Sequence, residues 1–136
     1  MALKKVCLQA GHGWLSGGAP GEMLWTQDTV LKMKDYLKGK CEVLVCGKQA
    51  NEDDIVTKTD WDLFLSVHYD ADIYNARGGF ADYPEPSTDG ATEESQRLAK
   101  AIGDYFFTKT GIPQKPQRSN ANTRYYYMWK YLFRRG

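Results

Sequence analysis

The sequence predicts an α/β fold: a single domain with a mostly parallel or mixed β-sheet flanked by helices on both faces. Segments with strand-like apolar runs alternate along the chain with segments of helical periodicity. The run within Asp62–Tyr69 is nearly continuously apolar, which is typical of a strand buried on both faces of a parallel sheet. The chain has 136 residues and shows no internal repeat or linker, so we assign one domain to residues 1–136.

The first half of the chain is predicted to hold three strands and one helix. Strands are expected at Lys5–Ala10, Glu42–Cys46 and Asp62–Tyr69. A glycine-rich loop, Gly11–Gly21, leads from the first strand into a helix at Glu22–Lys38, which Gly39 stops. The predicted apolar positions of this helix are Leu24, Val30, Leu31, Met33 and Leu37.

The second half is predicted to add one strand and one clear helix. Gly78–Tyr83 is a candidate fourth strand, and the aromatic segment Thr123–Leu132 is a candidate helix. Thr92–Thr108 has helical periodicity, with an apolar face expected at Leu98, Ile102, Tyr105 and Phe106.

Composition excludes several classes of protein. The net charge is +1, whereas a dedicated nucleic-acid binder normally has a clear basic excess. No apolar run reaches the roughly 20 residues of a membrane helix, and the N-terminus has no apolar core of a secretory signal, so we expect synthesis in the cytoplasm. The three cysteines, Cys7, Cys41 and Cys46, form no CxxC pair, which favours free structural thiols.

Three separated residues point to a metal site. His12 follows the first strand, Glu22 begins the next helix, and His68 ends the third strand. Because the carboxyl ends of parallel strands share one edge of a sheet, these residues can meet there. Two imidazoles and one carboxylate, with a fourth position open to water, are the ligand set of a catalytic zinc ion. Gly11 and Gly13 flank His12 and allow the backbone to turn sharply.

Simpler interpretations exist for each residue taken alone. A single histidine at a strand end is more often structural, and Glu22 is also explained by the helix macrodipole. However, the chain has only two histidines, and both fall at the same predicted sheet edge.

Two other segments allow functional interpretations, and both of these are weaker. The glycine-rich loop lacks the Gly-Lys-Ser/Thr ending of a phosphate loop, and the aromatic and basic run Arg124–Lys130, which could stack on sugars or bases, is better explained as a packed face.

Two motifs at the ends of predicted strands carry a resemblance to a known family. The first strand runs into Ala10-Gly11-His12-Gly13 and then Gly18-Ala19-Pro20-Gly21-Glu22. The third strand ends in Ser66-Val67-His68-Tyr69-Asp70-Ala71. Together these motifs resemble the zinc-dependent N-acetylmuramoyl-L-alanine amidases, which cut bacterial cell walls, and the resemblance extends over nearly the whole chain. Asp70 stands where that family usually has Asn.

The resemblance implies hydrolysis of the amide bond between N-acetylmuramic acid and L-alanine in peptidoglycan, with Zn²⁺ as cofactor. His12, Glu22 and His68 correspond to the three zinc ligands. The family places a catalytic Glu after a further C-terminal strand, and this chain ends at Tyr131–Gly136. We therefore expect a C-terminally incomplete domain with no assigned catalytic residue. A second chain or second copy would complete the sheet edge.

Two alternatives to this activity follow from the same features. One is a non-catalytic, zinc-containing module that binds the cell wall or is completed by a partner. The other is a different zinc peptidase on a similar sheet. The missing secretory signal fits a phage-encoded lysin that is made in the cytoplasm and acts on the cell wall.

Overall fold

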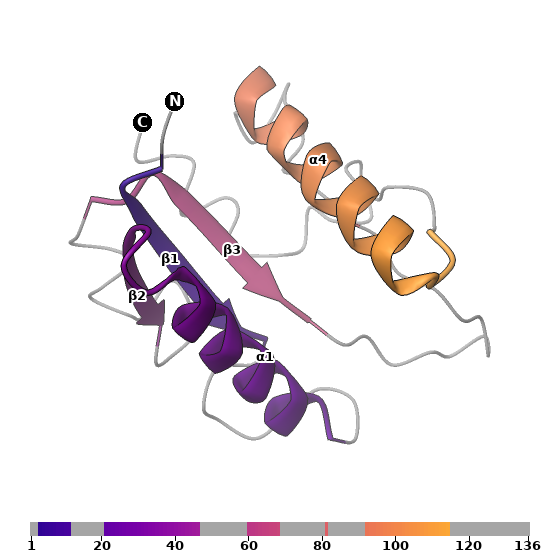
Figure 1. The fold of residues 1–136 in the computed structure, drawn as a ribbon, viewed down its shortest axis with the longest axis horizontal. Coiled ribbons are helices and arrows are strands. Elements are labelled where there is room, and N and C mark those ends of the chain that lie inside the picture. The colour runs from indigo at the N-terminus through magenta and orange to yellow at the C-terminus, as the bar shows by residue number, and fades with distance from the viewer. Residues whose placement is uncertain (1–2, 12–20, 47–59, 69–80, 82–91, 115–136) are drawn as a thin grey trace. The chain divides into compact units, whose positions relative to one another are not determined.

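Three parallel strands and two helices make up the part of the chain that the computed structural model describes (Figure 1). The described residues are 3–11, 21–46, 60–68, 81 and 92–114. They belong to two units, Met1–Ala71 and Asp72–Gly136, and each unit is considered separately below. The predicted α/β class and the parallel pairing are confirmed.

The sheet of the first unit has the strand order β2-β1-β3, so the first strand of the chain lies in the centre. The strands are β1 (Lys5–Ala10), β2 (Glu42–Cys46) and β3 (Leu63–Val67). The sequence predicted the bounds of β1 and β2 correctly. β3 is shorter than the predicted Asp62–Tyr69, because its ladder pairs Val6 with Leu63 at one end and Ala10 with Val67 at the other.

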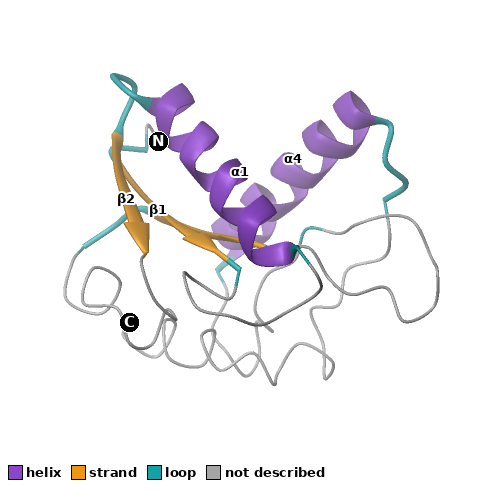
Figure 2. Ribbon diagram, turned by 90° about the horizontal axis from the view of Figure 1, so that it is seen from below, coloured by secondary structure: helices purple, strands orange, loops and turns teal. Residues whose placement is uncertain are grey.

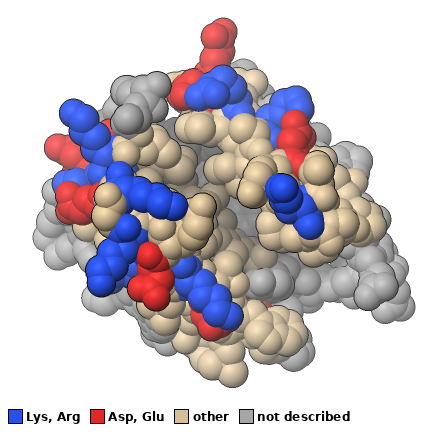
Figure 3. All heavy atoms as spheres, viewed as in Figure 1, with Lys and Arg blue, Asp and Glu red and all other residues tan. Residues whose placement is uncertain are grey.

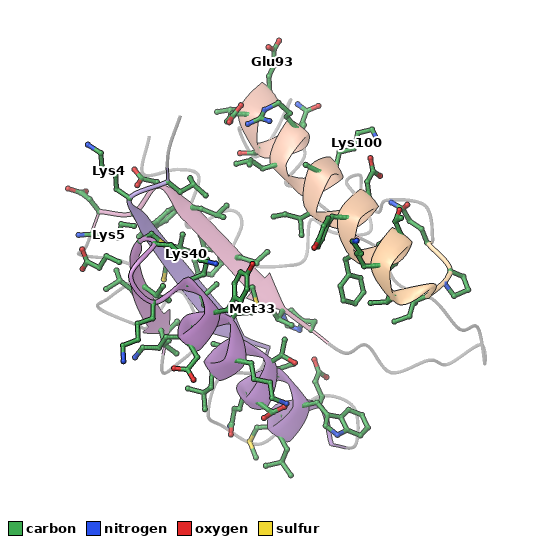
Figure 4. The ribbon with its side chains drawn as sticks, in the orientation of Figure 1. Lys4, Lys5, Met33, Lys40, Glu93 and Lys100 are labelled. Atoms are coloured by element: carbon green, nitrogen blue, oxygen red, sulfur yellow. The ribbon has the colours of Figure 1, made fainter. Side chains whose placement is uncertain are left out.

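Helix α1 (Glu22–Leu37) covers one face of this sheet (Figure 2). Every second residue of β1 points toward it, so that Val6, Leu8 and Ala10 form a buried cluster with Val30 of the helix. Partly buried apolar side chains from β2 and β3 pack around this cluster, and Met33 joins them from the helix (Figure 4).

The buried stripe of α1 differs from the predicted apolar face. Glu22, Thr26 and Val30 are buried, whereas Leu24 and Leu31 are 65% and 49% exposed. The spacing of four residues between the buried positions is that of one helix face. Two of its three positions are polar because the first two turns of the helix lie at the edge of the sheet where the candidate site is found.

Asp62 organises the opposite edge of the sheet, where the strands begin. Its Oδ2 accepts hydrogen bonds from the backbone N–H groups of Lys4 and Lys5, both at 2.8 Å. Its own N–H donates to the carbonyl of Lys5 at 2.9 Å. The hydrogen bonds from the N–H groups of Lys5 and Lys4 lower the pKa of the Asp62 carboxyl below its usual value because they stabilise the ionised form, and the bond from Lys5 has the larger effect.

The described part of the second unit is dominated by helix α4 (Glu93–Thr110). Thr92 caps its start by accepting a hydrogen bond from the N–H of Ser95, and Gly111, at φ 69°, ends it. Gly103 and Phe107 are its buried residues, whereas Tyr105 and Phe106 of the predicted apolar face are 68% and 48% exposed. The other predicted elements of this half, Gly78–Tyr83 (apart from Ala81) and Thr123–Leu132, lie outside the described residues.

On the face shown in Figure 3, acidic and basic side chains of the described residues lie next to one another. Several form pairs within one helix, such as Lys32 with Asp28 at 2.6 Å and Arg97 with Glu94 at 2.5 Å. Among the described residues, neither helix has the length and apolar character needed to cross a membrane. Cys7 and Cys46 are buried, as expected for structural thiols, whereas Cys41 is half-buried.

Candidate functional site

The candidate site begins where β1 and β3 end side by side. Ala10 is paired with Val67 in the parallel ladder, and the N–H of Gly11 donates to the carbonyl of Val67 at 2.7 Å. The ladder therefore extends one residue past Ala10. As a result, Gly11 and His68 occupy neighbouring positions at the carboxyl edge of the sheet, where ligand sites of parallel sheets gather.

Glu22 reaches the same edge from the first turn of α1. The helix starts at Gly21, which has a φ of 81°, and no side chain caps it. The carboxylate of Glu22 thus lies at the positive end of the helix macrodipole. Glu22 is only 2% exposed, which is unusual for a glutamate. Burying a carboxylate is unfavourable unless an opposite charge or hydrogen bonds offset the loss of its hydration.

Glu22 and His68 meet although 46 positions separate them in the sequence. Oε1 of Glu22 lies 3.2 Å from Nδ1 of His68, within hydrogen-bonding distance. The His68 side chain is 26% exposed, so one side of the pair faces away from the protein interior. The predicted convergence of these two residues is therefore present in the structure.

Gly11 provides the space that His68 occupies. A Cβ added at Gly11 would lie 2.6 Å from the carbonyl oxygen of Val67 and 2.7 Å from Nδ1 of His68. Both distances are shorter than real Cβ contacts. The sequence predicted that Gly11 allows a sharp turn of the backbone, and Gly11 does lie in a turn, without a positive φ. The structure adds a second reason for a glycine at this position, the close approach of the His68 ring to the backbone.

Thr26 connects the helix to this glycine. It is fully buried one helical turn after Glu22, and its Oγ1 donates to the carbonyl of Gly11 at 3.3 Å. The same hydroxyl lies 3.2 Å from the carbonyl of Met23, so its single proton is shared between two acceptors. Sequence reasoning missed Thr26. The available signal was a polar residue four positions after a candidate ligand, on the same face of the helix.

A second polar pair lies two residues before Gly11 and His68 along β1 and β3. Gln9 of β1 is 1% exposed, and its Oε1 accepts a hydrogen bond from Oγ of Ser66 at 2.8 Å. The two residues are partners in the β1–β3 ladder. Because buried polar groups normally require partners, this pair helps to set the register that places Gly11 beside His68.

Two of the three predicted metal ligands can be compared with the structure. Glu22 and His68 lie together, while His12 lies outside the described residues, directly after Gly11. Within the ranges that the structure describes, no group of three or more His, Cys, Asp or Glu side chains is gathered in a way that could hold a metal ion. The complete ligand set therefore stays a prediction.

The geometry of the Glu22–His68 pair is compatible with shared coordination of a zinc ion. Zinc binds imidazole nitrogen and carboxylate oxygen at about 2.0–2.1 Å in tetrahedral geometry, which separates two ligand atoms by roughly 3.3 Å. The separation of 3.2 Å between Oε1 and Nδ1 is close to this value. One anionic oxygen and one aromatic nitrogen are also the donor types that zinc accepts.

Comparison with known proteins agrees with the motifs and the fold. No curated protein and no solved structure matches the chain. The profile of one family, described as N-acetylmuramoyl-L-alanine amidase, matches residues 6–133. The match begins in β1, includes Glu22 and His68, and extends through both units. The chain therefore belongs to the N-acetylmuramoyl-L-alanine amidase family.

Proposed function

We propose that this protein hydrolyses the amide bond between N-acetylmuramic acid and L-alanine in bacterial peptidoglycan, and that it does so with a zinc ion held by His12, Glu22 and His68. Membership of the family supports the general activity and its cell-wall substrate. The observation that carries the zinc proposal is the contact of 3.2 Å between a buried carboxylate and an imidazole at the carboxyl edge of the sheet.

The position of Gly11 supports His12 as the third ligand. Consecutive Cα atoms are about 3.8 Å apart across a trans peptide bond. His12 is therefore attached to a residue whose Cα lies directly against the ring of His68. We propose that the imidazole of His12 completes the ligand set with Glu22 and His68.

The residues of the chain have separate tasks in this proposal. When bound, zinc supplies Lewis acidity at the scissile carbonyl and at the water that attacks it. Glu22 contributes a negative charge from a site that is almost closed to solvent, where electrostatic interactions are stronger than in water. His68 supplies an imidazole nitrogen that carries no proton when it binds a metal, and its Nδ1 lies 3.2 Å from Oε1 of Glu22, so that both donor atoms can serve one ion. We assign none of the described side chains as the general base.

The decisive variant is Glu22→Gln, which keeps the size of the side chain and removes its charge. We expect loss of bound zinc, and a fall of at least about 100-fold in release of L-alanine-linked peptide from purified peptidoglycan. This loss exceeds the roughly 10- to 100-fold typical of residues that only support metal ligands. Zinc content is measured by elemental analysis after reconstitution.

The matched control is Glu93→Gln. Glu93 also begins a helix, but it projects from the start of α4 into solvent (Figure 4). This variant should keep its zinc and its activity. Full zinc content in Glu22→Gln would refute the ligand assignment. Zinc binding without peptide release by the wild-type protein would instead favour a non-catalytic cell-wall module, and cleavage of plain peptides would favour another zinc peptidase.

A further inference from the structure

We infer that Thr26 is a positioning residue for the Glu22–His68 site, acting through its hydrogen bond to Gly11. This inference rests on the proposed zinc site. Among the described residues, Thr26 forms no hydrogen bond with Glu22 or His68, and in our proposal it does not contact the substrate. Its hydroxyl instead joins the helix that carries Glu22 to the strand end that lies against His68.

Thr26 shares one face of α1 with Glu22. It follows Glu22 by four residues, so both side chains lie on the buried face of the helix. A threonine in the middle of a helix has no propensity advantage, and at a fully buried position its hydroxyl must be hydrogen-bonded. A valine would fill the same volume without this requirement. Within its own helix the hydroxyl reaches the carbonyl of Met23 at 3.2 Å, and at the end of β1 it reaches the carbonyl of Gly11 at 3.3 Å. Only the contact with Gly11 joins α1 to the strand.

Gly11 is held by two elements of the fold. Its N–H donates to the carbonyl of Val67 of β3, and its carbonyl accepts from the hydroxyl of Thr26 of α1. This arrangement fixes the distance between the helix and the end of β1. It also fixes the backbone against which the ring of His68 rests.

The space between Gly11 and His68 leaves little room for movement. Any atom added to the Cα of Gly11 would overlap Nδ1 of His68, the atom that faces Glu22. A small shift of the Gly11 backbone therefore moves either the histidine ring or the helix. In both cases the separation between Nδ1 and Oε1 changes, and metal ligation depends on this separation to within a few tenths of an ångström.

The test is a set of three variants that separates the hydroxyl from the methyl group. Thr26→Ser keeps the hydroxyl and loses the methyl, Thr26→Val does the reverse, and Thr26→Ala loses both. The zinc dissociation constant is measured by competition with a chromophoric chelator, and the visible spectrum of the Co²⁺-substituted protein reports ligand geometry. We expect wild type and Thr26→Ser to agree, and Thr26→Val and Thr26→Ala to bind zinc roughly tenfold more weakly with an altered spectrum.

The melting temperatures of the same variants distinguish a positioning role of Thr26 from a purely structural one. The melting temperature should depend mainly on the methyl group, since it reports packing, whereas zinc affinity should depend on the hydroxyl. The control is Thr110→Val, which removes a threonine hydroxyl bonded to a helix carbonyl in α4 and should leave zinc affinity unchanged. If Thr26→Val does not fold, the comparison of Thr26→Ser with Thr26→Ala answers the same question.

Two outcomes would overturn the inference. One is zinc affinity that follows the methyl group, so that Thr26→Val resembles wild type and Thr26→Ser does not. The other is equal zinc affinity in all variants. A wild-type protein that binds no zinc would instead refute the proposed function itself, so the two failures are distinguishable.

Discussion

At the scale of single residues, the site depends on side chains that are absent or polar where an apolar group would be expected. Gly11 has no Cβ where His68 needs space, and Glu22 and Thr26 are buried on the face that packs against the sheet. Each is unfavourable as a choice for core packing alone. Their combination at one sheet edge is typical of a functional site, where local packing preferences are given up.

The effect of Gly11 can be tested with Gly11→Ala. The added methyl group would overlap the ring of His68 and the carbonyl of Val67, so that the ring must move. We expect zinc affinity to fall at least about tenfold, as for other changes that disturb the orientation of a metal ligand. Competition with a chelator measures this change.

A contrasting variant is Gly39→Ala. Gly39 has a φ of 78° and open space around the position of a Cβ. The substitution should lower the free energy of unfolding by about 1–2 kcal/mol through backbone strain, and it should leave zinc affinity unaltered. Unchanged zinc affinity in Gly11→Ala would mean that His68 does not ligate the metal in the described orientation.

At the scale of elements, the central position of β1 determines what meets at the site. β1 is hydrogen-bonded to both other strands, and α1 packs across it. The register with β3 aligns the residues that follow each strand, and α1, the next described element of the chain, begins with Glu22 at the same edge. The bounds of β1 and β2 were predictable because each is a short apolar run with clear limits. The buried face of α1 was not predictable from apolar periodicity, since Leu24 and Leu31 are exposed.

The start of the sheet provides a pH-dependent prediction through Asp62. Its carboxylate accepts from the N–H groups of Lys4 and Lys5, and these hydrogen bonds lower its pKa in the folded state. A carboxyl group with a lowered folded pKa stabilises the protein fully above its unfolded pKa of about 3.9. This contribution is lost as the pH falls through the lower folded value.

The variant Asp62→Asn keeps an oxygen acceptor and removes the charge. Its melting temperature should be lower than that of wild type at neutral pH, and the difference should shrink as the pH falls below about 3.9. A difference that stays constant across this range would show that the charge of Asp62 contributes nothing, and that only the shape of the side chain matters.

At the scale of the whole molecule, the family match extends over residues 6–133 and so includes residues of both units. The described residues of the first unit provide the sheet edge and two of the proposed ligands. Zinc binding should therefore be coupled to the folding of this unit, because its ligands come from a helix and from a strand end that are distant in sequence.

This coupling can be measured as a zinc-dependent thermal shift. A ligand that binds only the folded state stabilises it by about 2.7 kcal/mol at a free concentration of roughly 100 times its dissociation constant. We expect zinc to raise the melting temperature by several degrees, and a chelator to reverse the change. Glu22→Gln should show no shift. The same shift in this variant would indicate that zinc binds at another place, such as the thiol of Cys41, which is partly exposed.

The sequence by itself determined the fold class and the order of the first strands and helix along the chain. It also determined that Glu22 and His68 lie at the ends of elements that share one sheet edge. These features follow from local patterns: apolar runs, glycine stops and the general behaviour of parallel sheets. Only the tertiary structure decided that the Glu22 carboxylate is buried, that it approaches His68 to 3.2 Å, and that Thr26 and Gly11 connect the two. These contacts depend on how α1 docks against the sheet. That docking is set by the shape of the whole core, to which residues distant in sequence contribute, and so no local pattern specifies it.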